Sequence, residues 1–468
     1  MTTGRTPPAT PAHPGGLPAW TAISPLDGRY HERLAQLGRY FSEPALMASR
    51  CRVELRYLQA LDATGCFGPL SVQEHGRIEA ALAGFDDDDY ARIKELEARS
   101  RHDVKACEYF LVERLQLSQP WLVHFGLTSE DINNLAYTLL LAAYRQAEQL
   151  PLLDRLIETL RRLALAWADY PFPAHTHGQP ASPTTAGKEL AVFMTRLARQ
   201  RDRLRELCFM GKLNGATGTF AALLAARPDH DWLSFSERFV TDLGLVPNPL
   251  TTQIEDHDTW AEYFDITRRI AGIVLDLDVD CWEYISRGYF RQSARAGEVG
   301  SSTMPHKINP IHFENSEGNC ALAQSLLATL AGRLTHSRMQ RDLSDSTLER
   351  NVGVALAHQH LALIETLAGL ERIELDRVAC LAELEAHPEL LAEPFQVILK
   401  QAGVSDAYER LKTVTRGAAV TRDDLLAVLA GLTLPDELRQ RLASLCVASY
   451  VGDAARLCRR ACQAVEPT

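Results

Sequence analysis

The sequence predicts an all-α protein of three helical domains, arranged around a central bundle of long helices. Apolar residues recur at three- and four-residue spacing over four long stretches, with charged residues between them, which indicates helices that bury one face. Runs that alternate apolar and polar residues, the pattern of a half-buried strand, are short and few. At 468 residues the chain is also too long for a single compact core.

The first long helix is expected between residues 150 and 167. Its apolar residues, separated by Arg and Glu, are Leu152, Leu153, Leu156, Ile157, Leu160, Leu163 and Trp167. Pro171 and Pro173 end this helix, because proline lacks the backbone donor and disfavours helical geometry in the preceding residue. Three further long helices are expected at about residues 185–210, 259–289 and 313–334. Long antiparallel helices joined by loops favour a bundle.

The same patterns place the domain boundaries. We expect an N-terminal helical domain at residues 19–122, a bundle domain at residues 123–365 and a C-terminal helical domain at residues 366–468. Residues 1–18 are rich in Pro, Ala, Gly and Thr, a composition that predicts a disordered tail. The run Asp86–Asp89 is interpreted as a helix start or loop and not as a metal site, because four adjacent carboxylates repel one another.

Composition and charge exclude several classes of function. The formal net charge of −11 argues against nucleic-acid binding, which usually needs a basic face. No apolar run approaches the roughly 18–20 residues that cross a bilayer, and no signal peptide is evident, so no membrane partner is expected. The ten cysteines are scattered without a C-x-x-C pair, which fits a reducing cytoplasm and argues against zinc. Cys458 and Cys462 are four residues apart and are expected on one helix face.

The most informative segment is Gly300-Ser-Ser-Thr-Met-Pro-His-Lys-Ile-Asn-Pro310. It places three hydroxyls, an imidazole and a cation within a few residues, with glycines before them and prolines that limit helix continuation. A serine is a poor base unless a positive group stabilises its alkoxide. Lys307 is a candidate for that group, so that Ser301 or Ser302 could remove a proton. A generic S-S-x-M-P sequence would more simply be a polar surface turn before a helix, and this is the alternative to a catalytic segment.

This segment resembles the signature loop of the fumarase/aspartase superfamily, whose members eliminate fumarate from a succinyl group. Its continuation through Asn309-Pro-Ile-His-Phe-Glu314-Asn315 to Asn319 narrows the resemblance to the adenylosuccinate lyase family in its longer bacterial form. The resemblance runs from about Ser24 to the C-terminus, and the set of motifs in this order is very specific. The further motifs are Ser24-Pro-Leu-Asp-Gly-Arg29-Tyr30, Arg101-His102-Asp103-Val-Lys105, Thr128-Ser129-Glu-Asp-Ile-Asn-Asn134, Thr176-His177-Gly-Gln179-Pro180, Thr251-Thr252-Gln253-Ile254-Glu255 and Gln340-Arg341-Asp-Leu-Ser-Asp-Ser346-Thr-Leu-Glu-Arg350.

The resemblance implies release of fumarate from adenylosuccinate, giving AMP, and from succinylaminoimidazole carboxamide ribotide (SAICAR), giving AICAR. It also implies a homotetramer in which four central bundles form one core and each active site takes residues from three chains. No redox change occurs and no G-x-G-x-x-G or P-loop pattern is present, so no cofactor is expected. Argininosuccinate lyase and fumarase are the nearest alternatives. A different class is a structural protein that retains the fold, as lens crystallins of this superfamily do.

The resemblance also assigns the catalytic roles. Ser301 matches the family's base, with Ser302 as a carboxylate or phosphate contact, although sequence alone does not orient two adjacent serines. Histidine can hold and release a proton near neutrality, and His177 matches the acid. His102 resembles the second histidine, which binds substrate phosphate and supports the acid. Lys307 is expected to hold a substrate carboxylate and its developing charge, as is Asn309.

The remaining matches are expected substrate contacts. The alternative is that they are ordinary polar residues on the protein surface. An anionic substrate of an acidic protein requires a local convergence of cations, for which Arg29, Lys105, Lys307, Arg341 and Arg350 are the candidates. The expected contacts are Arg29, Tyr30, Arg101, Asp103, Thr128, Ser129, Thr176, Gln179, Gln253, Ser302, Asn309, Glu314, Asn315, Arg341, Ser346 and Arg350. Arg101 stands where some relatives have Asn. His175 is left as a structural residue, and the glycine-rich break at residues 212–218 is placed near the pocket by the superfamily.

Overall fold

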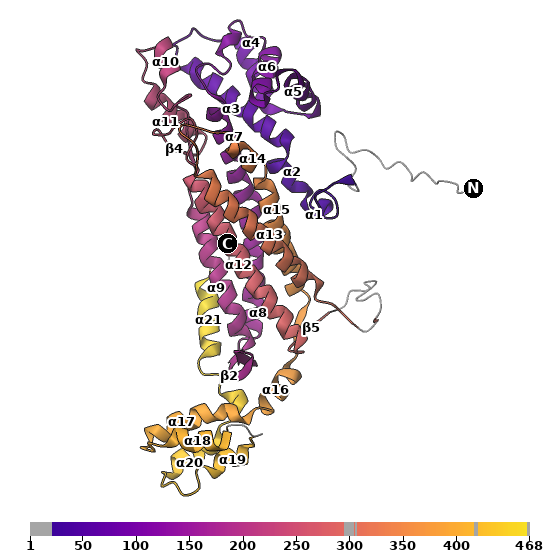
Figure 1. The fold of residues 1–468 in the computed structure, drawn as a ribbon, viewed down its shortest axis with the longest axis vertical. Helices are drawn as coiled ribbons and strands as arrows, with labels where there is room; N and C mark the ends of the chain where they lie inside the picture. Colours follow the sequence, from indigo (N-terminus) through magenta and orange to yellow (C-terminus); the bar gives the residue numbers. More distant parts are fainter. Residues whose placement is uncertain (1–20, 294–303, 305–306, 416–419, 466–468) are drawn as a thin grey trace, which may run out of the picture. The chain divides into compact units, whose positions relative to one another are not determined.

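The computed structural model describes residues 21–293, 304, 307–415 and 420–465. The chain divides into two compact units. The first unit comprises residues 1–151, 202–272 and 319–361, and the second comprises residues 152–201, 273–318 and 362–468. The described chain is mostly helical, with a few short strands, as Figure 1 shows. The all-α prediction is therefore confirmed. The predicted tail at residues 1–18 lies outside the described residues, and the three-domain division remains a prediction.

The long helices predicted from periodicity are present at nearly the predicted bounds. They are α8 (Leu150–Ala166), α9 (Ala186–Glu206), α12 (Asp258–Ser286) and α13 (Ile311–Leu334), to which the structure adds α15 (Val352–Leu370). Each of these five helices contributes residues to both units. A single π-helical stretch, Arg145–Gln149, connects α8 directly to α7 (Ser129–Tyr144). The predicted helix at residues 150–167 is therefore the second half of a longer helical run.

The other elements of the first unit are shorter. They are α1 (His31–Leu34), a 3₁₀ turn at Ala35–Leu37, α2 (Gly38–Phe41), α3 (Glu43–Ala63), α4 (Val72–Ala83), α5 (Asp87–Ser100), α6 (Asp103–Leu115), a 3₁₀ turn at Pro120–Leu122, β3 (Met210–Gly211), α10 (Ala221–Ala226), α11 (Trp232–Asp242), β4 (Val246–Pro247) and α14 (Ser344–Glu349). Strands β3 and β4 pair in parallel. Asp86 caps α5 and exchanges hydrogen bonds with Asp89, so this acidic run begins a helix, as predicted.

The second unit contains a hairpin, a small sheet and the C-terminal helices. They are β1 (Pro171–Thr176), β2 (Gln179–Thr185), β5 (Phe290–Gln292), β6 (Ile373–Leu375), α16 (Arg377–Glu385), a 3₁₀ turn at Pro388–Leu391, α17 (Ala392–Gln401), α18 (Ala407–Thr415), α19 (Arg422–Ala427), α20 (Asp436–Ser444), a 3₁₀ turn at Val447–Ser449 and α21 (Ala454–Ala464). Both strand pairs are antiparallel. Cys458 and Cys462 are buried on one face of α21 and contact carbonyl oxygens of α8, which confirms their predicted placement.

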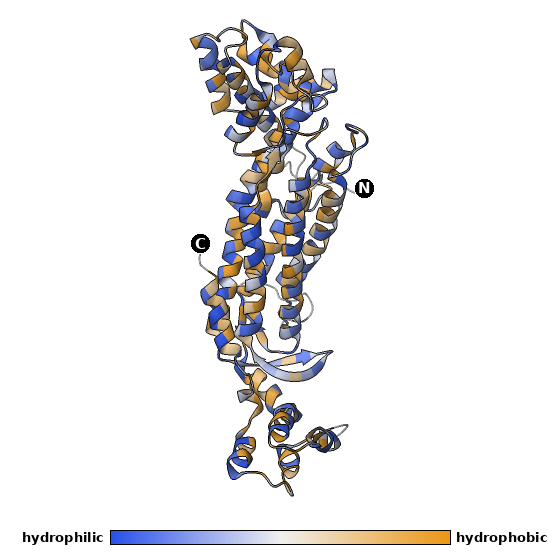
Figure 2. Cartoon of the chain, turned by 90° about the vertical axis from the view of Figure 1, so that its left-hand side faces the viewer, coloured by the Kyte–Doolittle hydropathy of each residue, from blue (hydrophilic) through white to orange (hydrophobic). Residues whose placement is uncertain are grey.

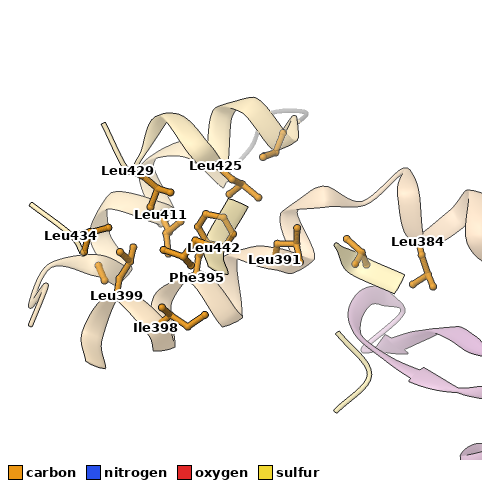
Figure 3. Packing of buried hydrophobic residues seen from close by; sticks show 13 residues of the cluster. Leu384, Leu391, Phe395, Ile398, Leu399, Leu411, Leu425, Leu429, Leu434 and Leu442 are labelled. Atoms are coloured by element: carbon orange, nitrogen blue, oxygen red, sulfur yellow. The ribbon is translucent and has the colours of Figure 1, made fainter. Parts of the chain in front are cut away.

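The C-terminal helices have a separate apolar core. Phe395, Leu411 and Leu442 are each at most 3% exposed and converge from α17, α18 and α20, as Figure 3 shows. Burying such side chains contributes roughly 1.5–3 kcal/mol each. This core is large enough to order the five short helices from α16 to α20, which individually are too short to be stable in water.

Candidate active site

A polar cavity of 310 Å³ in the first unit gathers many of the predicted substrate contacts. Its walls come from α3, the start of α6, the first turns of α7, and the segment around α14. The predicted residues that line it are Arg101, His102, Asp103, Ser129, Arg341, Ser346 and Arg350. With Arg50, four arginines face two carboxylates, Asp103 and Glu349, in this one cavity. Their excess of positive charge suits a multiply anionic ligand.

The turn between α5 and α6 holds three of these residues. Arg101 has a left-handed backbone (φ 52°), which stops α5 and redirects the chain. His102 then caps α6, because its Nδ1 atom accepts a hydrogen bond from the Lys105 amide at 3.2 Å. A neutral ring that accepts at Nδ1 carries its proton on Nε2. The exposed His102 ring can therefore donate from Nε2 to an anionic group.

Asp103 is held between two arginines. Its Oδ2 atom lies 3.0 Å from Nη1 of the buried Arg50 and 3.4 Å from Nη2 of Arg350. Burial alone would raise the pKa of Asp103, but the charge of Arg50 and a hydrogen bond from the Val104 amide hold it below its usual value. The carboxylate is thus ionised at neutral pH and pairs with both arginines.

Arg341 joins Gln253 to the cavity. The Arg341 Nη1 atom lies 3.5 Å from Oε1 of Gln253, and its Nη2 atom lies 3.5 Å from Oγ of Ser346 and 2.9 Å from Oε1 of Glu130. The amide of Gln253 also donates to the Ala216 carbonyl at 3.1 Å. Gln253 therefore lies at the edge of the same cluster, although it does not line the cavity itself.

A group of buried acids lies behind Arg341. Glu130, Asp345 and Glu349 are each at most 7% exposed, and Glu349 lies 3.5 Å from the buried His257. Burial, and then the charge of Glu349, raise the pKa of Glu130 to about 7, against the lowering effect of Arg341. Burial would lower the pKa of His257, but its contact with Glu349 raises it. Near neutral pH, Glu130 and His257 therefore bind protons more strongly than the same side chains do in water.

This arrangement predicts a pH-dependent contribution to stability. Because the folded pKa of Glu130 is raised, folded protein retains a proton that unfolded protein releases above about pH 4.3. The contribution of Glu130 to the free energy of unfolding is fully present at low pH, and it is lost as the pH rises through about 7. Glu130→Gln should therefore gain stability relative to wild type, on the order of 1–3 kcal/mol, between about pH 5 and pH 8. Denaturant unfolding of both proteins at the two pH values measures this difference, and a difference that does not change with pH would contradict the prediction.

The glycine-rich break at residues 212–218 forms a tightly packed loop beside α7. Lys212 is fully buried, with its Nζ atom 2.9 Å from Oδ1 of Asp131 and 3.1 Å from the Gly215 carbonyl. A Cβ atom on Gly218 would lie 2.1 Å from the Thr251 carbonyl oxygen, so only glycine fits there. The loop thereby fixes the segment that carries Gln253. The loop accepts a hydrogen bond from Gln253 at the Ala216 carbonyl, and its expected place near the pocket remains a prediction.

Besides Gln253, four predicted residues of the first unit lie outside the walls of this cavity. Arg29 and Tyr30 precede α1, with the guanidinium carbon 5.9 Å from the Tyr30 ring centre. Thr128 caps α7, where its amide donates to Asp131 at 2.9 Å. Lys105, a candidate for the convergence of cations, pairs with Glu108 on its own helix at 2.6 Å. Among the described residues, the side chains with a permanent positive charge that line the cavity are therefore arginines.

A second group of predicted residues lies in the second unit. Thr176 and Gln179 pair across the β1–β2 hairpin, whose two-residue tip is His177 and Gly178. Both tip residues have positive φ, 54° and 74°, which is the geometry of a type I′ turn. The imidazole of His177 is therefore presented on an exposed tip. The neighbouring His175 contacts Arg287 at 3.2 Å and packs on the Tyr289 ring, in keeping with a structural role.

The segment before α13 is described only in part. Ser301, Ser302 and His306 lie outside the described residues. Lys307 is exposed and Asn309 is half-buried, immediately before α13, and Glu314 and Asn315 lie in its first turn. The Oε1 atom of Glu314 accepts a hydrogen bond from the Trp282 indole at 3.1 Å. The sequence also leads us to expect that Glu314 steadies Lys307 or His177, and this remains a prediction.

Sequence reasoning missed the hairpin and the buried partners of the site. In the sequence, Pro171 and Pro173 predict only the end of a helix, whereas in the structure both lie in β1. The His-Gly pair that precedes Gln179 is a turn signal that could have found the hairpin. Arg50 and Asn133 were not predicted, because their contacts join residues more than 50 positions apart in the sequence.

Comparisons with known proteins agree with the motifs. The pattern of a family described as Lyase matches residues 71–324, and that of a family described as Adenylosuccinate lyase C-terminal matches residues 337–451. The adenylosuccinate lyase of Haemophilus influenzae is 45% identical over 449 residues, which cover 94% of this chain and 98% of that protein. The adenylosuccinate lyase of Escherichia coli K12 is 44% identical over 447 residues, with the same coverage. A solved structure, the 3-carboxy-cis,cis-muconate lactonizing enzyme of Pseudomonas putida, superimposes with a TM-score of 0.75 at 25% identity, over 92% of this chain and 97% of that one.

Proposed function

Because this chain belongs to the adenylosuccinate lyase family of the fumarase/aspartase superfamily, we propose that it releases fumarate from adenylosuccinate, giving AMP, and from SAICAR, giving AICAR. It is a fumarate-releasing lyase of purine biosynthesis. The main structural support for a substrate-binding site is the polar cavity. In it, Arg101, Arg341 and Arg350 lie beside His102 and Ser129. Arginine forks match phosphate and carboxylate oxygens, and both substrates carry these groups.

The elimination requires a base, a stabilised dianion and an acid. We assign the base to Ser301, with Ser302 as the alternative, to remove the proton on the carbon beside a substrate carboxylate. Lys307 and Asn309 would stabilise the aci-carboxylate that forms. As the C–N bond breaks, its electron pair goes to the nitrogen, which His177 protonates. His102 would bind the substrate phosphate and support the acid.

We also propose that the active protein is a homotetramer with shared active sites. Its support is the apolar surface that the long helices leave exposed in a single chain. The residues are Leu165 on α8, Val192 on α9, Val279 on α12, and Ile311 and Leu322 on α13, each at least 37% exposed. Figure 2 shows such apolar positions along the long helices. Burial of helix faces between bundles would remove this surface from water.

Mixing of two inactive variants tests the shared site. If Ser301 and His177 reach one site from different subunits, random hybrids of Ser301→Ala and His177→Asn subunits should regain about a quarter of wild-type activity, since both intact residues meet in that share of sites. The mixture is dissociated, reassociated and assayed for fumarate release. Each variant treated alone is the control. Hybrids as inactive as their parents, with exchange verified by mass, would contradict sharing of these two residues.

A cytoplasmic location follows from the same proposal. None of the ten cysteines, all of which are described residues, forms a disulfide, as expected in a reducing compartment. Among the described residues, no helix combines the length and the apolarity needed to cross a membrane.

Specificity is tested by a panel of substrates that share the succinyl group. Purified protein is given adenylosuccinate, argininosuccinate or malate at equal concentrations, and fumarate is followed. We expect adenylosuccinate to react with a kcat/KM at least about 10³-fold higher than the others, because the arginine cavity would be left unpaired by substrates without phosphate. A preference for argininosuccinate or malate would assign the chain to a sibling activity.

A further inference from the structure

Two of the cavity arginines, Arg341 and Arg350, are joined by an unbroken chain of polar contacts, which passes through residues of the cavity wall and the buried Glu130. Arg350 contacts Asp103 at 3.4 Å, and Asp103 contacts Arg50 at 3.0 Å. The Nε atom of Arg50 donates to Oδ1 of Asn133 at 2.9 Å. The amide of Asn133 donates to Oε1 of Glu130 at 2.7 Å, and the same oxygen lies 2.9 Å from Nη2 of Arg341.

Arg50 is the centre of this chain, which we call the arginine network (residues 50, 103, 130, 133, 341 and 350). Its side chain is 3% exposed, and it contacts Asp103 and Asn133 through two different nitrogen atoms; the nitrogen that contacts Asp103 also donates to Sδ of Met47 at 3.6 Å. A guanidinium can do this because its donors point in fixed, divergent directions, whereas a lysine ammonium is a single point. One residue of α3 thereby ties the start of α6 to the first turns of α7.

Packing alone does not hold Arg350. Arg50, Asp103 and Arg350 also line a neighbouring, more apolar cavity of 220 Å³, and Arg350 lines a third cavity of 360 Å³. The side chain of Arg350 is 60% exposed, and the contact that the structure gives it in the site is Asp103. With open space on both sides, an unpaired arginine would populate several rotamers and lose conformational entropy on binding a ligand.

We propose that Arg50 is a positioning residue, which holds Arg350 and Arg341 in the orientation that binds the anionic groups of the substrate without touching the substrate itself. This inference rests on the proposed function, because it takes both arginines as substrate contacts. Arg50 orients Arg350 through Asp103 and Arg341 through Asn133 and Glu130. The network thus prepares two separate cations for one ligand before it binds.

The test compares Arg50→Lys with a matched control, Arg201→Lys, in the full-length protein. Arg201 of α9 is 7% exposed at its side chain and lies 3.2 Å from Asp154 of α8, nearly the same burial and distance as the Arg50–Asp103 pair, but it does not line the cavity. The KM and kcat for adenylosuccinate are measured from fumarate release. We expect Arg50→Lys to raise KM by about 10- to 100-fold with a smaller change in kcat, and Arg201→Lys to change KM by less than about twofold.

A double-variant cycle separates positioning from a general loss of structure. In an Arg350→Ala background, Arg50→Lys should raise KM by a much smaller factor than in wild type, because one of the arginines that it positions is gone. The same factor in both backgrounds would overturn the proposal, as would equal KM values for Arg50→Lys and Arg201→Lys. Should Arg50→Lys not fold, Asn133→Leu breaks the link to Glu130 and is expected to raise KM as well; an unchanged KM in that variant would overturn the proposal.

The experiments distinguish a failure of the positioning proposal from a failure of the proposed function. Wild-type protein that releases no fumarate from adenylosuccinate would overturn the proposed function, whatever the variants do. Active wild-type protein with a normal KM in Arg50→Lys would overturn only the positioning role.

Discussion

Replacement of Ser301 by alanine is expected to lower kcat for adenylosuccinate by about 10²- to 10⁴-fold while substrate binding is retained. The alanine variant loses the group that removes the proton, but it keeps the arginine cavity and the cation of Lys307. The loss should therefore fall on the chemical step. It is measured as kcat from fumarate release and as the dissociation constant of adenylosuccinate by calorimetry, which the inactive variant makes possible.

Ser302→Ala is the matched control, because it removes the neighbouring hydroxyl from the same segment. We expect it to raise KM and to retain most of kcat, since Ser302 is assigned a contact with a carboxylate or phosphate. The opposite result, with kcat lost in Ser302→Ala and retained in Ser301→Ala, would exchange the two roles. A Ser301→Ala variant that no longer binds substrate would identify Ser301 as a binding residue.

Replacement of His177 is expected to have an effect of similar size. Without an acid the leaving nitrogen departs unprotonated, so kcat should fall by about 10²- to 10⁴-fold. Asparagine is the better substitution at this position, because the backbone of His177 has a φ of 54° and asparagine adopts that conformation more readily than alanine. The His177→Asn variant thereby keeps the hairpin turn and isolates the chemistry of the imidazole.

His175→Asn provides the comparison on the same hairpin. His175 lies two residues before His177, on strand β1, where it contacts Arg287. The His175→Asn variant should retain turnover, because His175 is assigned no part in the reaction. Normal turnover in His177→Asn would remove His177 as the acid, and an equal loss in both variants would point to damage of the hairpin.

The long helices could be predicted from the sequence because their periodicity is a local property. The apolar residues of α8 and α12 repeat over many turns, so the helix bounds agree with prediction to within a few residues. The β1–β2 hairpin could not be predicted in this way. Its strands carry four prolines, and their residues do not alternate strongly between apolar and polar; the strands pair around a two-residue turn.

The candidate site shows the same division between local and distant information. Motifs such as Arg101-His102-Asp103 stand in one turn, so their resemblance to a family could find them. The residues that orient them come from distant parts of the chain. Arg50 meets Asp103 and Asn133 only because α3, α6 and α7 pack together, and no sequence pattern around Arg50 marks it as a site residue.

The most direct test of the central claim is to quantify both products from adenylosuccinate, with purified protein and without added metal or cofactor. The account predicts AMP and fumarate in equal amounts, and AICAR and fumarate in equal amounts from SAICAR. Intact substrate after prolonged incubation with folded protein would contradict it, and would leave the fold without the activity that its family implies.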